Sequence, residues 1–187
     1  MGRKTIGIVA GSLRRDSYCK AVGRYLAGLL DGQFDVKFVD ISDLAVYSED
    51  LDNGEDAPRE WERLRREVKA LDAVLFVTPE YNRSMPAALK NALDVASRPY
   101  GANCWGGKPG AVVSVSPGSI GAFGANHHLR QTAAFLNIFM MQQPEAYIGG
   151  IDRAVNAGAV DDEKLQDFLR QFAGAYAVWV KEFTEYE

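Results

Sequence analysis

Cysteine and histidine are scarce in this chain, and the few present do not form a metal-binding pattern. The 187 residues include two cysteines and two histidines. Cys19 and Cys104 lie far apart and form neither a C-x-x-C pair nor a ligand spacing with His127 and His128. Adjacent helical residues point about 100° apart, so the two histidines cannot easily share one ion. We expect reduced thiols and no metal. Cys19, close to a predicted helix start, is either a reactive thiol or a packed core residue.

The sequence also lacks a long apolar run and a block of basic residues. No apolar stretch approaches the length of a membrane span, and the sequence MGRK leads into the first apolar run without a signal-peptide hydrophobic region. The formal net charge is −4, with acids and bases interspersed. These absences predict a cytoplasmic protein with no nucleic acid and no membrane among its partners.

What remains is an ordinary globular composition. Hydrophobic residues make up 47% of the sequence and charged residues 25%, which is typical of a folded protein with a good-sized core. No internal repeat, low-complexity tract or linker divides the chain. We therefore expect one domain that spans residues 1–187.

Short apolar runs alternate with segments of helical periodicity. The patterns predict strands at 6–10, 34–40, 73–78, 111–115 and 140–147, and helices at 18–30, about 58–70, 87–96, about 125–136 and from 161 onward. The run at 73–78 is almost wholly apolar, as expected for a central parallel strand covered on both faces. The acidic segment 42–58 has no periodicity and is predicted to be a long connection. Five strands alternating with five helices predict an α/β fold, a doubly wound five-stranded parallel sheet with helices on both faces.

The loop between the first strand and the first helix has the chemistry of an anion site. Gly11 allows close backbone approach, the Ser12 and Ser17 hydroxyls can donate hydrogen bonds, and Arg14 can hold two oxygens beside a helix N-terminus. The alternative is an ordinary loop in which Asp16 or Ser17 caps the helix, and the loop alone does not decide between them. The stretch matches neither G-x-G-x-x-G nor a P-loop, which disfavours a Rossmann dinucleotide site and an NTPase.

Two further loops at the predicted carboxyl ends of strands are chemically unusual for connections. The segment after 73–78 reads PEYNRSMP, and the segment after 111–115 reads SPGSIGAFG. Open doubly wound sheets bind ligands outside the carboxyl ends of their strands. In a flavodoxin-like sheet the first loop can hold the single phosphate of FMN, with the ring between the other two loops.

Three motifs recur together in one known family. They are GSLR with Ser17, TPEYN through Pro86, and LKNALD at 89–94. The stretches HLR at 128–130 and PE at 144–145 also resemble the pattern of that family. At this joint spacing the chain resembles the NADPH-dependent FMN reductase family, including its chromate- and quinone-reducing members. The resemblance covers about residues 4–150. The family usually has asparagine where this chain has Cys19.

The resemblance implies a flavodoxin-like fold, bound FMN, reduction by NADPH or NADH, and a homo-oligomer, either a dimer or a tetramer. It implies no catalytic side chain, because the flavin carries out the hydride chemistry. Glu80 is interpreted as a structural or subunit-contact residue rather than a general acid. The candidate cofactor-binding residues come from the three loops: Gly11, Ser12, Leu13, Arg14, Ser17, Cys19, Pro79, Glu80, Tyr81, Asn82, Arg83, Ser84, Ser116, Pro117, Gly118, Ser119 and Gly121.

One functional prediction and two alternatives follow. We expect an FMN-dependent NAD(P)H oxidoreductase with a ping-pong cycle, whose small-molecule electron acceptors would be quinones, free flavin, azo compounds or metal oxyanions such as chromate. The first alternative is a flavodoxin-type electron carrier that serves a protein partner. Flavodoxins usually have a Ser/Thr-rich phosphate loop and a strongly acidic face, whereas this loop contains Arg14 and Arg15. The second alternative is a non-enzymatic flavin-binding scaffold or stress-response interaction protein.

Overall fold

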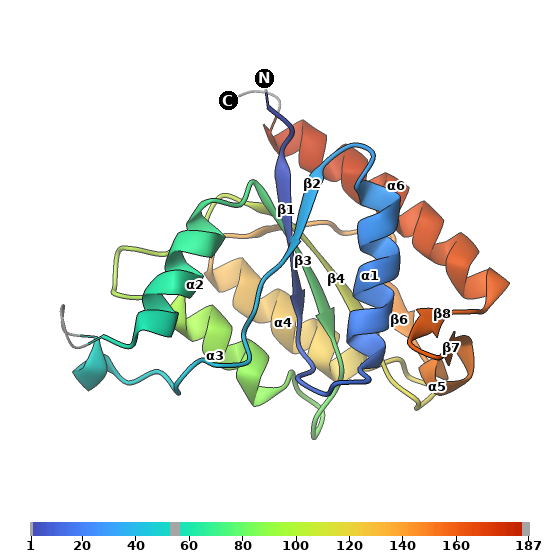
Figure 1. Cartoon of the computed structure of the whole chain (residues 1–187), viewed down its shortest axis with the longest axis horizontal. Coiled ribbons are helices and arrows are strands. Elements are labelled where there is room, and N and C mark those ends of the chain that lie inside the picture. The colour runs from blue at the N-terminus through green and yellow to red at the C-terminus, as the bar shows by residue number, and fades with distance from the viewer. Residues whose placement is uncertain (1, 53–56, 185–187) are drawn as a thin grey trace.

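A parallel sheet runs through the middle of the molecule, with helices on both faces (Figure 1). The computed structural model describes residues 2–52 and 57–184. The strand order is β2-β1-β3-β4-β5, with β6 also paired to β4, and every pairing in this sheet is parallel. This is the flavodoxin-like order, so the predicted doubly wound α/β fold is confirmed. The strands of this sheet are β1 (Thr5–Ala10), β2 (Asp35–Phe38), β3 (Ala73–Thr78), β4 (Pro109–Val115), β5 (Phe139–Met140) and β6 (Ala146–Ile148).

The side chains of the central strands alternate between two hydrophobic cores, because successive residues of a strand point to opposite faces. In β3, Leu75 and Val77 belong to the core under α1 and α6, whereas Phe76 belongs to the core under α2, α3 and α4. The hydroxyl of Tyr176 in α6 also donates to the Val74 carbonyl at 2.8 Å, which ties that helix to the sheet. The longer helices are α1 (Tyr18–Leu30), α2 (Arg59–Lys69), α3 (Ala87–Val95), α4 (Phe123–Phe135) and α6 (Glu163–Thr184).

The fifth predicted strand, at 140–147, is divided in the structure. Its first part, β5, pairs with Pro109 and Gly110 of β4, and its second part, β6, pairs with residues 113–115. The two parts are separated by a stretch that contains Pro144, which has no N–H to donate to a ladder. The sheet therefore has six strands, with β5 and β6 sharing one edge of β4.

Residues 151–160 form a small unit that the sequence patterns do not predict. It consists of a short helix, α5 (Ile151–Ala154), and a two-stranded antiparallel hairpin of β7 (Val155–Asn156) and β8 (Ala159–Val160). The Arg24 guanidinium of α1 donates to the Gly158 carbonyl at 2.9 Å and holds the hairpin beside that helix. Elements of two to four residues are too short to produce a recognisable periodicity.

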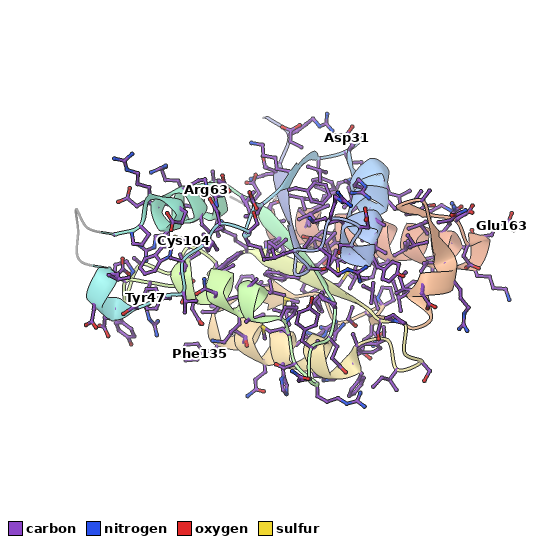
Figure 2. All side chains as sticks on the ribbon, turned by 60° about the horizontal axis from the view of Figure 1, so that its bottom comes forward. Asp31, Tyr47, Arg63, Cys104, Phe135 and Glu163 are labelled. Carbon is purple, nitrogen blue, oxygen red and sulfur yellow. The ribbon has the colours of Figure 1, made fainter. Side chains whose placement is uncertain are left out.

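The long connection between β2 and α2 is fastened to the helices beneath it, although its sequence is aperiodic. Asp52 accepts hydrogen bonds from two nitrogens of Arg65 at 2.8 and 2.7 Å, and the Trp61 indole donates to the Ala45 carbonyl at 3.0 Å. Tyr47, labelled in Figure 2, donates its backbone N–H to Asn91 of α3 at 2.9 Å. The segment includes a 3-10 turn, η1 (Glu49–Leu51), and its residues 53–56 lie outside the described residues.

None of the helices in residues 2–52 and 57–184 combines the length and the apolar character needed to cross a membrane.

Candidate functional site

Three loops meet around one cavity at the carboxyl ends of β1, β3 and β4. The cavity has a volume of ≈ 140 Å³. Its lining residues are Ser12, Arg14, Ser17, Tyr18, Cys19, Pro79, Glu80, Tyr81, Val115, Ser116 and Pro117. All except Tyr18 and Val115 are candidate residues from the sequence. Those two begin a helix and end a strand, and a motif search confined to loops overlooks such positions.

The first loop is held by the start of α1 and by the neighbouring strand. Ser17 is the N-cap of α1, and its hydroxyl oxygen accepts the Lys20 N–H at 3.4 Å. Gly11 donates its N–H to the Val77 carbonyl at 2.8 Å. A Cβ at Gly11 would lie 3.3 Å from the Pro79 ring, so the first and second loops are closely packed there. Ser17 therefore caps the helix, as the ordinary-loop alternative requires, and the same loop also faces the cavity.

Two polar groups of this loop have no hydrogen-bond or ion-pair partner among the described residues. The Ser12 side chain is almost buried, yet no hydrogen bond from another described residue reaches its hydroxyl. Arg14 forms no ion pair within the described part of the chain, and its guanidinium carbon lies 5.8 Å from the centroid of the Tyr18 ring. Arg14 is exposed, and a hydroxyl and a guanidinium that are free to take a partner beside a helix N-terminus are suited to bind an anion.

The second loop is a tight hairpin-like turn. Tyr81 and Ser84 exchange two backbone hydrogen bonds of 2.9 and 3.0 Å, and the residues between them, Asn82 and Arg83, have φ values of 50° and 66°. Two consecutive positive φ angles are typical of a type I′ turn. Asn82, Arg83 and Ser84 do not line the cavity, and the Ser84 hydroxyl lies 2.9 Å from Nδ1 of His128. The turn leaves Tyr81 half exposed at the cavity.

The Glu80 carboxylate caps another helix. Its side chain is 11% exposed, accepts the Ala125 N–H near the start of α4 at 3.1 Å, and pairs with Arg83 at 3.1 Å. A Cβ at Gly124 would lie 2.7 Å from the Arg83 carbonyl oxygen, so only glycine permits this close approach without a shift. These contacts support the structural interpretation of Glu80, because a carboxylate at a helix N-terminus satisfies free N–H groups and opposes the dipole.

The third loop is anchored on β6. Ser116 donates its N–H to the Ile148 carbonyl at 2.9 Å, and its hydroxyl oxygen accepts the Gly118 N–H at 3.0 Å. Gly121 has a φ of 60°, and a Cβ there would lie 2.4 Å from the Tyr147 carbonyl carbon. Gly121 therefore fixes the loop rather than lining the cavity. The candidates outside the cavity lining are Gly11, Leu13, Asn82, Arg83, Ser84, Gly118, Ser119 and Gly121, and their roles stay predictions.

Cys19 is a packed residue. Its side chain is 1% exposed and belongs to the core under α1 and α6. Burial raises the pKa of its thiol to about 12, against the smaller opposing effects of a hydrogen bond with Ser17 and the charge of Arg14. Of the two alternatives for this cysteine, the structure supports the inert one.

Comparisons with known proteins agree with this geometry. Residues 4–152 match the family described as NADPH-dependent FMN reductase. A quinone reductase of Pseudomonas putida is 50% identical over 177 residues, covering 95% of both chains. A 2-hydroxy-1,4-benzoquinone reductase of a Burkholderia species is 46% identical over 178 residues, covering 95% of this chain and 96% of the relative. The solved structure of FerB, a flavoenzyme NAD(P)H:(acceptor) oxidoreductase of Paracoccus denitrificans, has a TM-score of 0.89 at 42% identity and covers 96% of this chain and 98% of its own.

The state of Cys19 predicts slow alkylation. With a pKa of about 12, only about one thiol in ten thousand is ionised at pH 8, and the thiolate is the reactive form. In native protein treated with iodoacetamide at pH 8, peptide mass spectrometry should find Cys19 unmodified. The same treatment in guanidinium chloride should modify both Cys19 and Cys104. Rapid native modification of Cys19 would contradict the packed state.

Proposed function

The chain belongs to the NADPH-dependent FMN reductase family, and we propose that it is an FMN-dependent oxidoreductase that transfers reducing equivalents from NADPH or NADH to quinones. One observation carries the proposal: three loops meet at the carboxyl ends of β1, β3 and β4. There the Ser12 hydroxyl and the Arg14 guanidinium, which form no hydrogen bond or ion pair with another described residue, lie beside the N-terminus of α1. Two relatives are named for quinone substrates, which supports that acceptor class. Free flavin, azo compounds and chromate are further acceptors to be tested.

The residues present fit FMN. The Ser12 and Ser17 hydroxyls and the Arg14 guanidinium, together with the free N–H groups of α1, match one phosphate in donor type and charge. Pro79, Tyr81 and Pro117 supply apolar surface from the other two loops, as a flat ring requires. This one phosphate cradle favours FMN over FAD. We also propose that residues 1–187 act as one domain.

The chain's own residues bind and orient rather than transfer protons. FMN, when bound, would supply the hydride chemistry between the nicotinamide and the second substrate. Arg14 and the two serines hold the phosphate end, and the Tyr81 and Pro117 side chains limit where the ring can lie. Glu80 holds the second loop against α4 through its contacts with Ala125 and Arg83. Rate then depends on the position of the reacting partners.

The colour of the purified protein is the direct test. The protein should be yellow, should bleach when NADPH is added without oxygen, and should recover its colour when a benzoquinone follows. Chromatography of the heat-released flavin should identify FMN. A flavodoxin-type carrier would stay yellow with NADPH, and release of FAD, or failure to bind any flavin, would contradict the proposal.

Arg14→Ala should weaken FMN binding by about 1.5–3 kcal/mol, because it removes a charge-assisted contact with the phosphate. Arg15→Ala is the matched control, since Arg15 is 95% exposed and faces Asp16 at 3.8 Å. Flavin fluorescence titration of the apoprotein gives both dissociation constants. Equal affinities in the two variants would remove Arg14 from the phosphate site.

Glu80→Gln should leave the rate of flavin reduction by NADPH within about tenfold, equivalent to about 1.4 kcal/mol in the barrier, because the carboxylate acts as a cap. Arg83→Asn is the control, since it removes only the ion pair at a turn position that asparagine tolerates. Anaerobic stopped-flow absorbance measures the rate. A loss of about a thousandfold in Glu80→Gln, with FMN still bound, would instead identify an acid or base.

We also propose that the protein is a homo-oligomer of two or four chains. Large apolar side chains are about half exposed around the site, namely Tyr81, Ile120 and Phe123. Beside them, the Tyr147 hydroxyl lies 3.0 Å from Nε2 of His127 and donates to Glu145 at 2.8 Å. Patches of this kind are typical of interfaces. Light scattering at micromolar concentration should give a multiple of 20.5 kDa, and a mass near that of one chain would contradict the proposal.

The place of action follows from the reductant. We propose that the protein works in the cytoplasm, because NADH and NADPH are maintained inside the cell.

A further inference from the structure

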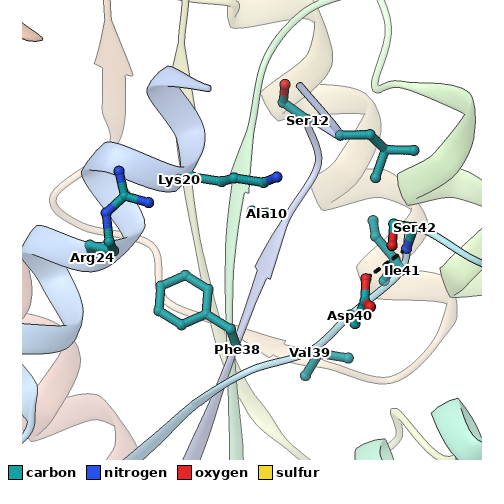
Figure 3. Close-up of a pocket in the computed structure, with 10 residues that line it drawn as sticks. Ala10, Ser12, Lys20, Arg24, Phe38, Val39, Asp40, Ile41 and Ser42 are labelled. Carbon is teal, nitrogen blue, oxygen red and sulfur yellow. Dashed lines mark hydrogen bonds between the residues drawn. The ribbon is translucent and has the colours of Figure 1, made fainter. Parts of the chain in front are cut away.

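A second, larger pocket lies beside the proposed flavin cavity. It has a volume of ≈ 480 Å³ and is formed by α1, by the loop at 11–13 and by the chain that follows β2 (Figure 3). Ser12 lines both cavities. The lining residues are Ala10, Ser12, Leu13, Lys20, Arg24, Phe38, Val39, Asp40, Ile41 and Ser42. We call it the α1–β2 pocket. Its residues take no part in the flavin site described above, except at the shared loop.

We propose that the α1–β2 pocket binds an adenosine phosphate. This inference rests on the function proposed above, and the expected source of the adenosine phosphate is the adenosine half of NADH or NADPH. A free adenosine nucleotide has the same chemistry and is the other source.

An exposed aromatic ring offers a surface for a flat base. Phe38 ends the edge strand β2 and is 48% exposed, and Leu13 on the loop is 47% exposed. Figure 3 shows the Phe38 ring in the space between α1 and β2. The ring packs against α1 at Gly23, where a Cβ would lie 3.1 Å from its Cε1 atom. A planar base between these two side chains would bury apolar surface that water now covers.

Lys20 of α1 supplies a cation to the pocket, and Arg24 also lines it while its guanidinium donates to the Gly158 carbonyl at 2.9 Å. Lys20 and Arg24 are one helical turn apart, and Figure 3 shows the Lys20 ammonium reaching into the pocket. Neither forms an ion pair with any carboxylate among the described residues. Residues 11–30 contain four basic side chains and one acidic one, in a chain whose net charge is −4. The Lys20 ammonium is therefore available to a phosphate group in this pocket.

A carboxylate that can accept further hydrogen bonds also lines the pocket. Asp40 follows β2, and its Oδ1 accepts the Ser42 N–H at 2.9 Å (Figure 3). Hydrogen bonds from Ser42 lower the pKa of Asp40, with weaker contributions from the charges of Arg63 and Lys20. The ionised group can therefore accept hydrogen bonds from sugar hydroxyls.

Calorimetric titration of the FMN-loaded protein with 5′-AMP tests the pocket directly. Lys20→Met removes a phosphate partner and Phe38→Leu removes the ring, and each should weaken AMP binding about tenfold. Lys37→Met is the matched control, because Lys37 is exposed on the same strand and does not line the pocket. Its AMP affinity should equal that of the original protein. Absence of AMP binding at millimolar concentration, or equal affinity in all four proteins, would overturn the proposal.

Steady-state inhibition distinguishes the two sources. Competitive inhibition by AMP against NADPH, with a raised KM for NADPH in Lys20→Met, identifies the dinucleotide; inhibition or binding without competition identifies a free nucleotide. The FMN affinity of each variant is measured alongside, so that an indirect effect through the shared loop is recognised. A protein that NADPH bleaches but that binds no AMP overturns this inference alone. A protein that binds AMP through Lys20 but is not bleached overturns the proposed function alone.

Discussion

The parallel pairing of β1 with β3 is the contact on which the site depends. The pairing continues past the strands through the hydrogen bond from Gly11 to the Val77 carbonyl, at 2.8 Å. It places the first and second loops against each other, so that groups 60 to 70 residues apart in the sequence share one cavity. The third loop joins them because β4 pairs with the other side of β3. Sheet register thus determines which side chains can act together, and the loops supply their chemistry.

Glycine positions set how closely the loops approach. A Cβ added at Gly11, Gly121 or Gly124 would lie within 3.3 Å of neighbouring backbone or side-chain atoms. The approach at Gly124 lets the Glu80 carboxylate reach the start of α4. The second loop is therefore tied to a helix that begins some forty residues later.

Much of this architecture could be predicted from sequence, because strong local patterns agree with it. The apolar run at 73–78 could hardly be anything but a buried strand, and Ser17 stands where a helix cap is expected. Sequence patterns do not predict features that depend on contacts between distant segments or on very short elements. The cap formed by Glu80 joins residues 45 positions apart, and the hairpin at 155–160 is too short to show a period. The α1–β2 pocket was also missed, since alternation at 34–40 gives no sign that the Phe38 ring stays exposed.

The Asp52–Arg65 contact has a consequence for behaviour in acid. Both side chains are largely buried, at 6% and 15% exposure, and the hydrogen bonds from Arg65 lower the pKa of Asp52. A carboxyl whose folded pKa lies below its unfolded value stabilises the fold above the unfolded pKa, and that stability is lost as pH falls through the folded one. The tie between the long connection and α2 therefore persists at pH values where ordinary surface carboxyls have already taken up protons. Acidification would loosen the exposed ion pairs first and release this connection late.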